Sequence, residues 1–575
     1  MIQEALLVLG TYVSLGACIS SASPQGLWET TIRTNSGPVR GVQAFPTKPA
    51  FNISSWQDIT VWKGIPYGAS TAYENRFKAP QPPKPWTGVR NADKFGDICP
   101  VDPNQEAGYP ISEDCLNLNI WTAGSSITAK LPVVLWSYPD GASASQPRFD
   151  GAKMASRGLV FVNYNYRAAA FAYLVHPELH EERLRESGHN SSGNYRMLDQ
   201  YAALKWVHEN IANFGGDPSK ITVAGESGGS AAVYHLVNGP FSKGMISGAI
   251  SESGIRDPYD PMCATLAENY KDLDYRLEEG KDFLKDRIAS SIKDLRALKM
   301  EDLLVPLSFG PKGKPKDPGN GKGGKGKGMG GKGMGGKGPP AFKNLPSSSR
   351  AWQFGTTLDY FAIPDKYIDT LKKGPANDVP LITGNNKDES GVLPDGQNSP
   401  EEYKSEMEAL FGKLAPRFFE LYPGRNSSEA SLSYNSYYRD ANRVSSWLYG
   451  NKWAKSAKAP FYSYYWDHAP PGTTQAGHMS EIVYALGNLH TQNLSYTAED
   501  YAVEEKLNSY WVNFAKTGNP NTGDAYKDGT LEQWHPSVES KEMTHNVGNS
   551  WGNVPIAEPA KVQFISDFFA SQKPF

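Results

Sequence analysis

The chain has 575 residues, of which 39% are hydrophobic and 21% are charged, and its formal net charge is −3. These proportions are typical of a globular protein. The small net charge gives no basis for binding nucleic acid or an anionic membrane surface. Length alone would permit several domains, so the domain number has to come from the pattern of elements.

Residues 1–22 have the features of a secretory signal peptide. A broken apolar stretch covers residues 5–17, and the small residues Ser20, Ser21 and Ala22 suit cleavage near Ala22. The stretch is short for a membrane span and lacks a basic flank, so we expect no integral membrane anchor. Asn-x-Ser sequons also fit a secreted, extracellular glycoprotein, and they lie at Asn52, Asn190, Asn426 and Asn493.

Short apolar segments then alternate with helical patterns. Strands are expected at residues 39–43, 59–63, 116–121, 131–136, 159–163, 221–224, 245–250 and 379–383. The nearly continuous apolar runs at 131–136 and 159–163 are typical of strands covered on both faces. Residues 199–213 have helical periodicity. The alternation predicts one α/β domain over residues 23–575, with a large, mostly parallel, doubly wound sheet and helices on both faces.

Ser227 stands in a pattern that predicts a nucleophile. Gly225, Ser227 and Gly229 form a G-x-S-x-G motif between the expected strand and a helical pattern over residues 230–236. A serine on so sharp a turn needs glycine on both sides, because a Cβ there would meet neighbouring backbone. The motif alone also fits an ordinary turn, but the flanking strand and helix favour a nucleophilic serine.

A nucleophilic serine requires a base, and histidine is the expected one. The histidines that follow Ser227 are His235, His468, His478, His490, His535 and His545. His235 is too close on the same helix, and His468 falls in an aromatic strand where a structural role is expected. His478 lies between a loop and a helical pattern, a position from which its ring can reach a sheet edge.

The base in turn requires an orienting carboxylate, which follows the serine along the chain in sites of this kind. Asp388 and Glu389 both come directly after the expected strand at 379–383. Open α/β sheets place their chemistry at the carboxyl ends of strands, so either residue is suitably placed. Their positions alone do not separate them.

Motifs along the mature chain resemble the type-B carboxylesterase, cholinesterase and lipase family of α/β-hydrolases. In order, the motifs are at residues 63–67, 112–121, 165–167, 194–200, 214–218, 225–229, 252–254, 386–389, 477–482 and 510–520. The resemblance implies the α/β-hydrolase fold and a secreted serine carboxylic-ester hydrolase. Such an enzyme forms an acyl-enzyme, needs no cofactor or metal, and acts on a small-molecule or lipid ester.

The family's functional residues map onto this chain position by position. The implied triad consists of Ser227, His478 and Glu389. The resemblance also implies a disulfide and two scaffold ion pairs: Cys99–Cys115, Arg76–Glu113 and Arg167–Asp199. With these cysteines paired, Cys263 is expected to be a buried thiol without a disulfide partner.

One stretch departs from the family pattern. Where the family usually has three glycines whose N–H groups bind the oxyanion, this chain reads Ser137-Tyr-Pro-Asp-Gly-Ala142. Pro139 has no N–H, and Asp140 brings a carboxylate beside a developing negative charge. By position, the remaining donors are Asp140, Gly141 and Gly228. Either the Asp140 side chain turns away, or the enzyme is slow or specialised.

This departure keeps two other functions open. One is a catalytically impaired recognition protein on a hydrolase scaffold, suggested by Tyr138, Pro139 and Asp140. The other is an acyl-transfer or tailoring enzyme of a biosynthetic pathway.

Two further segments complete the prediction. Residues 310–340 contain eight lysines among glycines and one aspartate, which predicts a disordered insertion in the domain. We weigh a solvated loop against an electrostatic contact with acidic polymers. His176-Pro-Glu-Leu-His180 resembles a zinc-protease helix but has proline in place of the glutamate, so no metal is expected.

Overall fold

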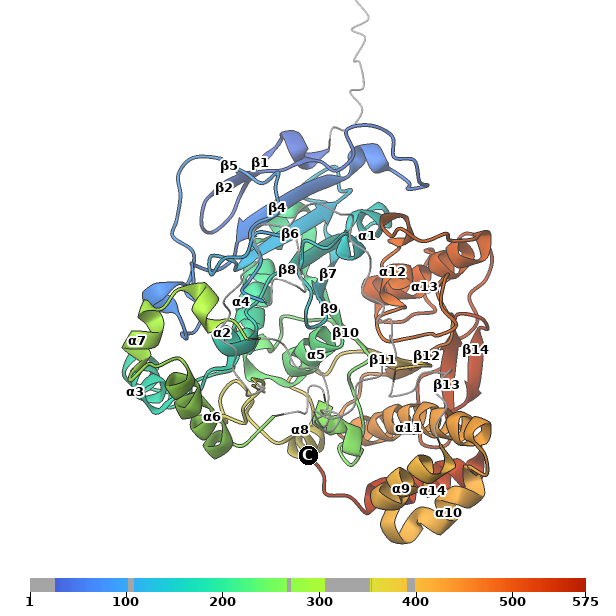
Figure 1. The fold of residues 1–575 in the computed structure, drawn as a ribbon. Helices are drawn as coiled ribbons and strands as arrows, with labels where there is room; N and C mark the ends of the chain where they lie inside the picture. The colour runs from blue at the N-terminus through green and yellow to red at the C-terminus, as the bar shows by residue number, and fades with distance from the viewer. Residues whose placement is uncertain (1–25, 102–107, 266–269, 306–351, 353, 390–398) are drawn as a thin grey trace, which may run out of the picture.

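The computed structural model describes residues 26–101, 108–265, 270–305, 352, 354–389 and 399–575 (Figure 1). The predicted signal peptide (1–22) and the Lys/Gly-rich insertion (310–340) lie outside these residues. None of the helices in the described ranges is long and apolar enough to cross a membrane.

Within the described residues, eleven strands form one sheet in the order β14-β13-β12-β11-β10-β9-β7-β8-β6-β4-β3. The central strands are parallel: β7 (Leu131–Ser137), β8 (Val160–Tyr164), β9 (Gly216–Glu226), β10 (Gly248–Glu252), β11 (Leu381–Asn386), β12 (Phe461–Trp466) and β13 (Met543–Val547). Antiparallel strands flank them: β3 (Val42–Gln43), β4 (Thr60–Pro66), β6 (Asn117–Thr122) and β14 (Gly552–Pro555). The predicted large, mostly parallel sheet is confirmed.

Helices cover both faces of this sheet. In Figure 1, α2 (Ala169–Tyr173) and α4 (Tyr195–Asn210) lie on one side of the central strands. On the other side lie α1 (Ala152–Ser156), α12 (Ile482–Ala485) and α13 (Ala498–Thr517). α5 (Gly228–Asn238) follows β9 and contacts β7, β9 and β10. Coverage on both faces explains why β7 and β8 are almost entirely apolar.

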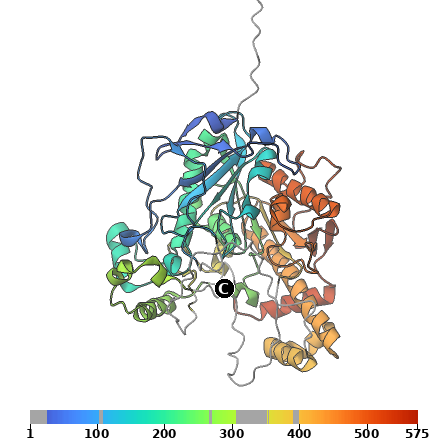
Figure 2. The same cartoon turned by 45° about the horizontal axis from the view of Figure 1, so that its top comes forward.

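The remaining elements surround this core. A small sheet of β1 (Thr31–Arg33), β2 (Pro38–Arg40) and β5 (Arg90–Asn91) precedes it. The other helices are α3 (Pro177–Ser187), α6 (Leu273–Asp286), α7 (Ile292–Ala297), α8 (Tyr367–Lys373), α9 (Pro400–Phe411), α10 (Ala415–Leu421), α11 (Ser427–Ser456) and α14 (Pro559–Ala570). In Figures 1 and 2, α9, α10 and α14 lie on the opposite side of the molecule from the N-terminal strands, coloured blue. An apolar cluster joins them to α11, with Phe411 and Phe418 in it.

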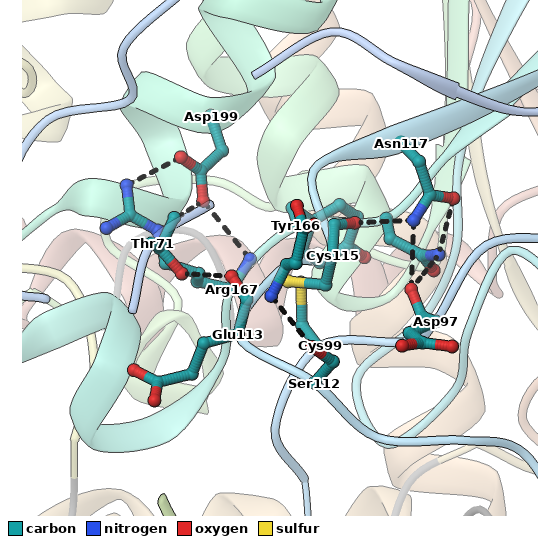
Figure 3. The surroundings of a disulfide bond; sticks show 12 residues. Thr71, Asp97, Cys99, Ser112, Glu113, Cys115, Asn117, Tyr166, Arg167 and Asp199 are labelled. Carbon is teal, nitrogen blue, oxygen red and sulfur yellow. Dashed lines mark hydrogen bonds and ion pairs between the residues drawn. A yellow bond between two sulfur atoms is a disulfide. The ribbon is translucent and has the colours of Figure 1, made fainter. Parts of the chain in front are cut away.

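Cys99 and Cys115 form the predicted disulfide, with their Cα atoms 4.9 Å apart. Figure 3 shows the hydrogen bonds around it: Asn117 Nδ2 donates to Asp97 O at 2.9 Å, and Thr71 Oγ1 donates to Glu113 O at 2.8 Å. Cys263 is buried and forms no disulfide, as expected. The hydrogen bond of Asn117 ties the disulfide loop to the start of β6.

Both predicted scaffold ion pairs are present and buried. Arg76 Nη2 lies 2.5 Å from Glu113 Oε2, and Arg167 Nη2 lies 2.6 Å from Asp199 Oδ1. Arg167 Nη1 also donates a hydrogen bond to the carbonyl of Lys78 at 2.7 Å. The buried guanidinium is therefore paired with an opposite charge and also hydrogen-bonded to the backbone. This pair fixes α4 to the segment after β8.

Arg167→Met should lower the free energy of unfolding by about 3–5 kcal/mol, because it leaves the Asp199 carboxylate buried without its partner. Chemical denaturation would measure the loss. The control is Lys205→Met, which breaks the exposed i,i+4 ion pair of Lys205 with Glu209 on α4, the helix that also carries Asp199. Its expected cost is about 0.5 kcal/mol or less, and an equal cost for the two variants would contradict the assignment.

Candidate active site

Ser227 occupies a strained turn between β9 and α5. Its backbone has φ 54° and ψ −117°, and its N–H donates to Glu252 O at 3.0 Å. A Cβ built on Gly229 would lie 1.9 Å from Ser137 O, and one on Gly225 would lie 2.6 Å from the same atom. Glycine is therefore required at both flanking positions, and the half-buried serine stands at the carboxyl end of the sheet.

Asp388 holds two loops together at this edge. Its N–H donates to Ala476 O at 2.9 Å, and Ala476 N–H donates back to Asp388 Oδ2 at 3.0 Å. Arg439 of α11 lies 2.5 Å from Asp388 Oδ1. These contacts fix the Asp388 carboxylate to the loop before His478.

Glu389 lies beside His478 instead. His478 Nδ1 is 3.5 Å from Glu389 Oε1 and 3.2 Å from Oε1 of Glu226, the residue before Ser227. The imidazole is therefore next to the Ser227 turn, with Nδ1 on the carboxylate side and Nε2 on the other edge of the ring. The His478 side chain is 38% exposed, whereas both glutamates are buried.

Four buried glutamates, Glu226, Glu252, Glu389 and Glu481, lie close enough to affect one another's ionisation at this site. Burial raises the pKa of Glu226 well above its usual value, and nearby carboxylates raise it further. Burial also raises the pKa of Glu252 and of Glu481. For Glu389, burial opposes ionisation, but the hydrogen bond and charge of His478 outweigh it, so the pKa of Glu389 is lowered. Glu389 is consequently the ionised member of the group at neutral pH.

The same interaction acts on the histidine. Burial works against the charged imidazole, but the hydrogen bond and charge of Glu389 outweigh burial and raise the pKa of His478 above its usual 6.5. An imidazole paired with one ionised carboxylate is suited to accepting a proton in a reaction and returning it.

Glu226 is the residue near this histidine that the sequence reasoning missed. The signal was present, because a glutamate ends an otherwise apolar strand and stands inside the G-x-S-x-G motif. Glu252 and Glu481 were equally unrecognised as neighbours, and each has a donor: Trp511 Nε1 for Glu252 at 2.7 Å and Asn386 Nδ2 for Glu481.

The segment Tyr138–Gly141 lies against the turn. In the described part of the chain, the backbone N–H groups of Asp140, Gly141 and Gly228 donate to no protein acceptor. The Asp140 side chain does not turn away, since a Cβ built on Gly228 would lie 2.5 Å from Asp140 Cγ. Asp140 forms an ion pair with Arg196 of α4.

The other histidines have different surroundings. His468 Nε2 is 2.9 Å from Asp500 Oδ1, His490 stacks on Phe51 with ring centroids 3.6 Å apart, and the His545 ring stacks on Trp534. His235 is buried in α5, and His535 is exposed.

His176 and His180 lie at the start of α3. No group of three or more metal-binding side chains occurs among the residues that the structure describes. His176 instead accepts a hydrogen bond from the N–H of Glu178 at the start of α3, and His180 is buried.

A parallel sheet, a serine on a strained strand-to-helix turn and a histidine–carboxylate pair at its edge define an α/β-hydrolase. The chain belongs to the carboxylesterase family, whose model matches residues 29–274 and 341–553. Members of this family are carboxylic ester hydrolases.

Relatives and solved structures agree with this assignment. A fumonisin B1 esterase of Sphingopyxis macrogoltabida is 29% identical over 543 residues, covering 90% of this chain and 86% of its own. A para-nitrobenzyl esterase of Bacillus subtilis is 30% identical over 499 residues, covering 82% of this chain and 90% of its own. A solved PNB esterase structure superposes with a TM-score of 0.68 at 27% identity, covering 93% and 99% of the two chains.

Glu389→Gln should move the acid limb of the kcat/KM profile to lower pH. If His478 is the general base, it acts in its neutral form, so activity should fall as pH decreases through the pKa of His478, which is raised above 6.5. Removing the charge that raises this pKa should shift the limb by about one unit or more and also lower kcat.

The matched control is Glu226→Gln, which alters a carboxylate at 3.2 Å from the same nitrogen. Because burial and neighbouring carboxylates raise the pKa of Glu226 and so favour its neutral form, the acid limb of the Glu226→Gln variant should stay within about 0.3 unit of the wild type. An equal shift in both variants would show that the charge is shared and would overturn the assignment of Glu389.

Proposed function

We propose that this protein hydrolyses carboxylic esters of small molecules or lipids through an acyl-enzyme on Ser227. The observation that carries the proposal is the strained Ser227 turn beside His478, whose Nδ1 faces the ionised Glu389. In this proposal His478 is the general base and Glu389 orients it and stabilises its charged form.

The chemistry follows in two balanced steps. Ser227 Oγ attacks the ester carbonyl while His478 Nε2 takes the hydroxyl proton, and the N–H groups of Asp140, Gly141 and Gly228 receive the oxyanion. The intermediate then collapses, and His478 returns the proton to the departing alcohol. Water repeats the sequence on the acyl-enzyme and releases the carboxylic acid, so no cofactor is needed.

The names of the relatives guide the first assays. They describe esterases for fumonisin B1 and para-nitrobenzyl esters, so aryl and benzyl esters with acyl chains of different length are suitable probes. A recognition protein without activity is the second candidate, favoured by Pro139 and Asp140 in the oxyanion segment. For a third candidate, acyl transfer, a competing alcohol would yield a new ester in place of the free acid.

Ser227→Ala should lower hydrolysis of an aryl ester by about 10⁴-fold or more, because the nucleophile is removed. A fluorophosphonate should label Ser227 in the folded wild type and leave the variant unlabelled, as mass spectrometry of the peptide would show. Unchanged hydrolysis in the variant would refute the proposal. An unlabelled, inactive wild type would favour the recognition protein.

We also propose secretion and glycosylation. The apolar leader supports secretion, and all four sequon asparagines are exposed: Asn52, Asn190, Asn426 and Asn493. Protein collected from the medium of a eukaryotic host should begin near Ser23 and lose mass on treatment with an N-glycosidase. An intact N-terminus inside the cells would contradict the secretion proposal.

A further inference from the structure

The Asp140 carboxylate occupies the space next to the residue that follows Ser227. A Cβ built on Gly228 would lie 2.5 Å from Asp140 Oδ1 and 2.6 Å from Oδ2. The Asp140 side chain is 40% exposed, so it lies at the open side of the turn. A negative charge there opposes the negative charge that develops on the substrate oxygen.

Arg196 opposes this carboxylate from inside the protein. Its Nη1 forms an ion pair with Asp140 Oδ1, and its side chain is only 7% exposed. Its guanidinium carbon lies 4.5 Å from the centroid of the Tyr166 ring. Burial works against the Arg196 charge, but Asp140 and the neighbouring tyrosines outweigh burial and raise its pKa, so the guanidinium stays charged.

Arg196 also reaches the oxyanion segment through Tyr166. Arg196 Nη2 donates to Tyr166 Oη at 3.4 Å, and Tyr166 Oη donates to the carbonyl of Tyr138. The Tyr166 N–H donates to Tyr138 Oη at 3.3 Å, and the two rings stack with centroids 4.3 Å apart. The backbone just before Pro139 and Asp140 is thereby fixed to the same assembly.

We infer that Arg196 is a positioning residue for the oxyanion site. It neutralises Asp140 and holds the segment Tyr138–Gly141 in place, and this lets the chain tolerate an acidic residue beside the oxyanion site. The inference rests on the proposed esterase function, in which that segment supplies N–H donors.

The inference predicts opposite effects on kcat when the two partners of this ion pair are substituted one at a time. Arg196→Met leaves the Asp140 carboxylate uncompensated beside the oxyanion and should lower kcat by about 100-fold, with KM little changed, similar to the loss of one oxyanion donor. Asp140→Asn leaves the Arg196 charge uncompensated and should raise kcat severalfold. The double variant should return to within about threefold of the wild type, and Arg196→Lys should retain more activity than Arg196→Met.

Arg167→Met provides the matched control, because it breaks another buried arginine–aspartate pair that involves α4. Adding Asp140→Asn to it should raise kcat only by the severalfold factor that Asp140→Asn gives in the wild type, without the larger recovery expected in the Arg196→Met background. Thermal unfolding and the rate of fluorophosphonate labelling would be measured on every variant. If Arg196→Met does not fold, two measurements still test the inference. They are the direction in which Asp140→Asn changes kcat and the activity that Arg196→Lys retains.

Two results would overturn the inference: Asp140→Asn lowers kcat, or it fails to restore a folded Arg196→Met variant. Either would mean that the pair supports the fold alone. Failure of the proposed function is a separate outcome, because then either Ser227→Ala would remain active or the wild type itself would be inactive and unlabelled. If Ser227→Ala is inactive but the changes in kcat of the Asp140 and Arg196 variants have the opposite direction to those predicted, the proposed esterase function is retained. Only the positioning role of Arg196 is then refuted.

Discussion

The close approach of three backbone segments at the carboxyl end of β9 is the constraint on which the rest of the site depends. Ser227 turns with positive φ, and Gly229 comes so near Ser137 that no side chain fits between them. Parallel pairing of β7 with β9 produces this contact. It brings Ser227, the first turn of α5 and the segment after β7 to one point.

Around that point the protein buries several carboxyl groups but ionises them selectively. Glu389 keeps its charge because His478 faces it, whereas Glu226, closer by distance to the same nitrogen, is driven toward the neutral form by burial. Proximity alone therefore does not identify the orienting acid. The surroundings of each carboxyl group decide which one is ionised. One imidazole can stabilise one negative charge, whereas a second negative charge would repel the first.

The substitution of the usual glycines shows how an unfavourable residue is accommodated. Asp140 introduces a charge and Pro139 removes a donor, yet the N–H groups of Asp140 and Gly141 stay without protein acceptors in the described residues. The stabilising partner, Arg196, comes from a helix far away in sequence. The chain thus combines the family's scaffold with an electrostatic arrangement of its own at the reacting end.

The sequence by itself determined most of the central strands and the Ser227 turn, because side-chain periodicity and the steric need for glycine are local properties. It did not predict β13 and β14. It did not reveal the long helix α11, and it left Asp388 and Glu389 undivided. The family resemblance implied Glu389, and the tertiary structure gives the physical reason: Arg439 of α11 pairs with Asp388, whereas Glu389 lies beside His478. The direction of the Asp140 side chain is also known only from the tertiary structure. It depends on the contact with Arg196, which lies far away in the sequence.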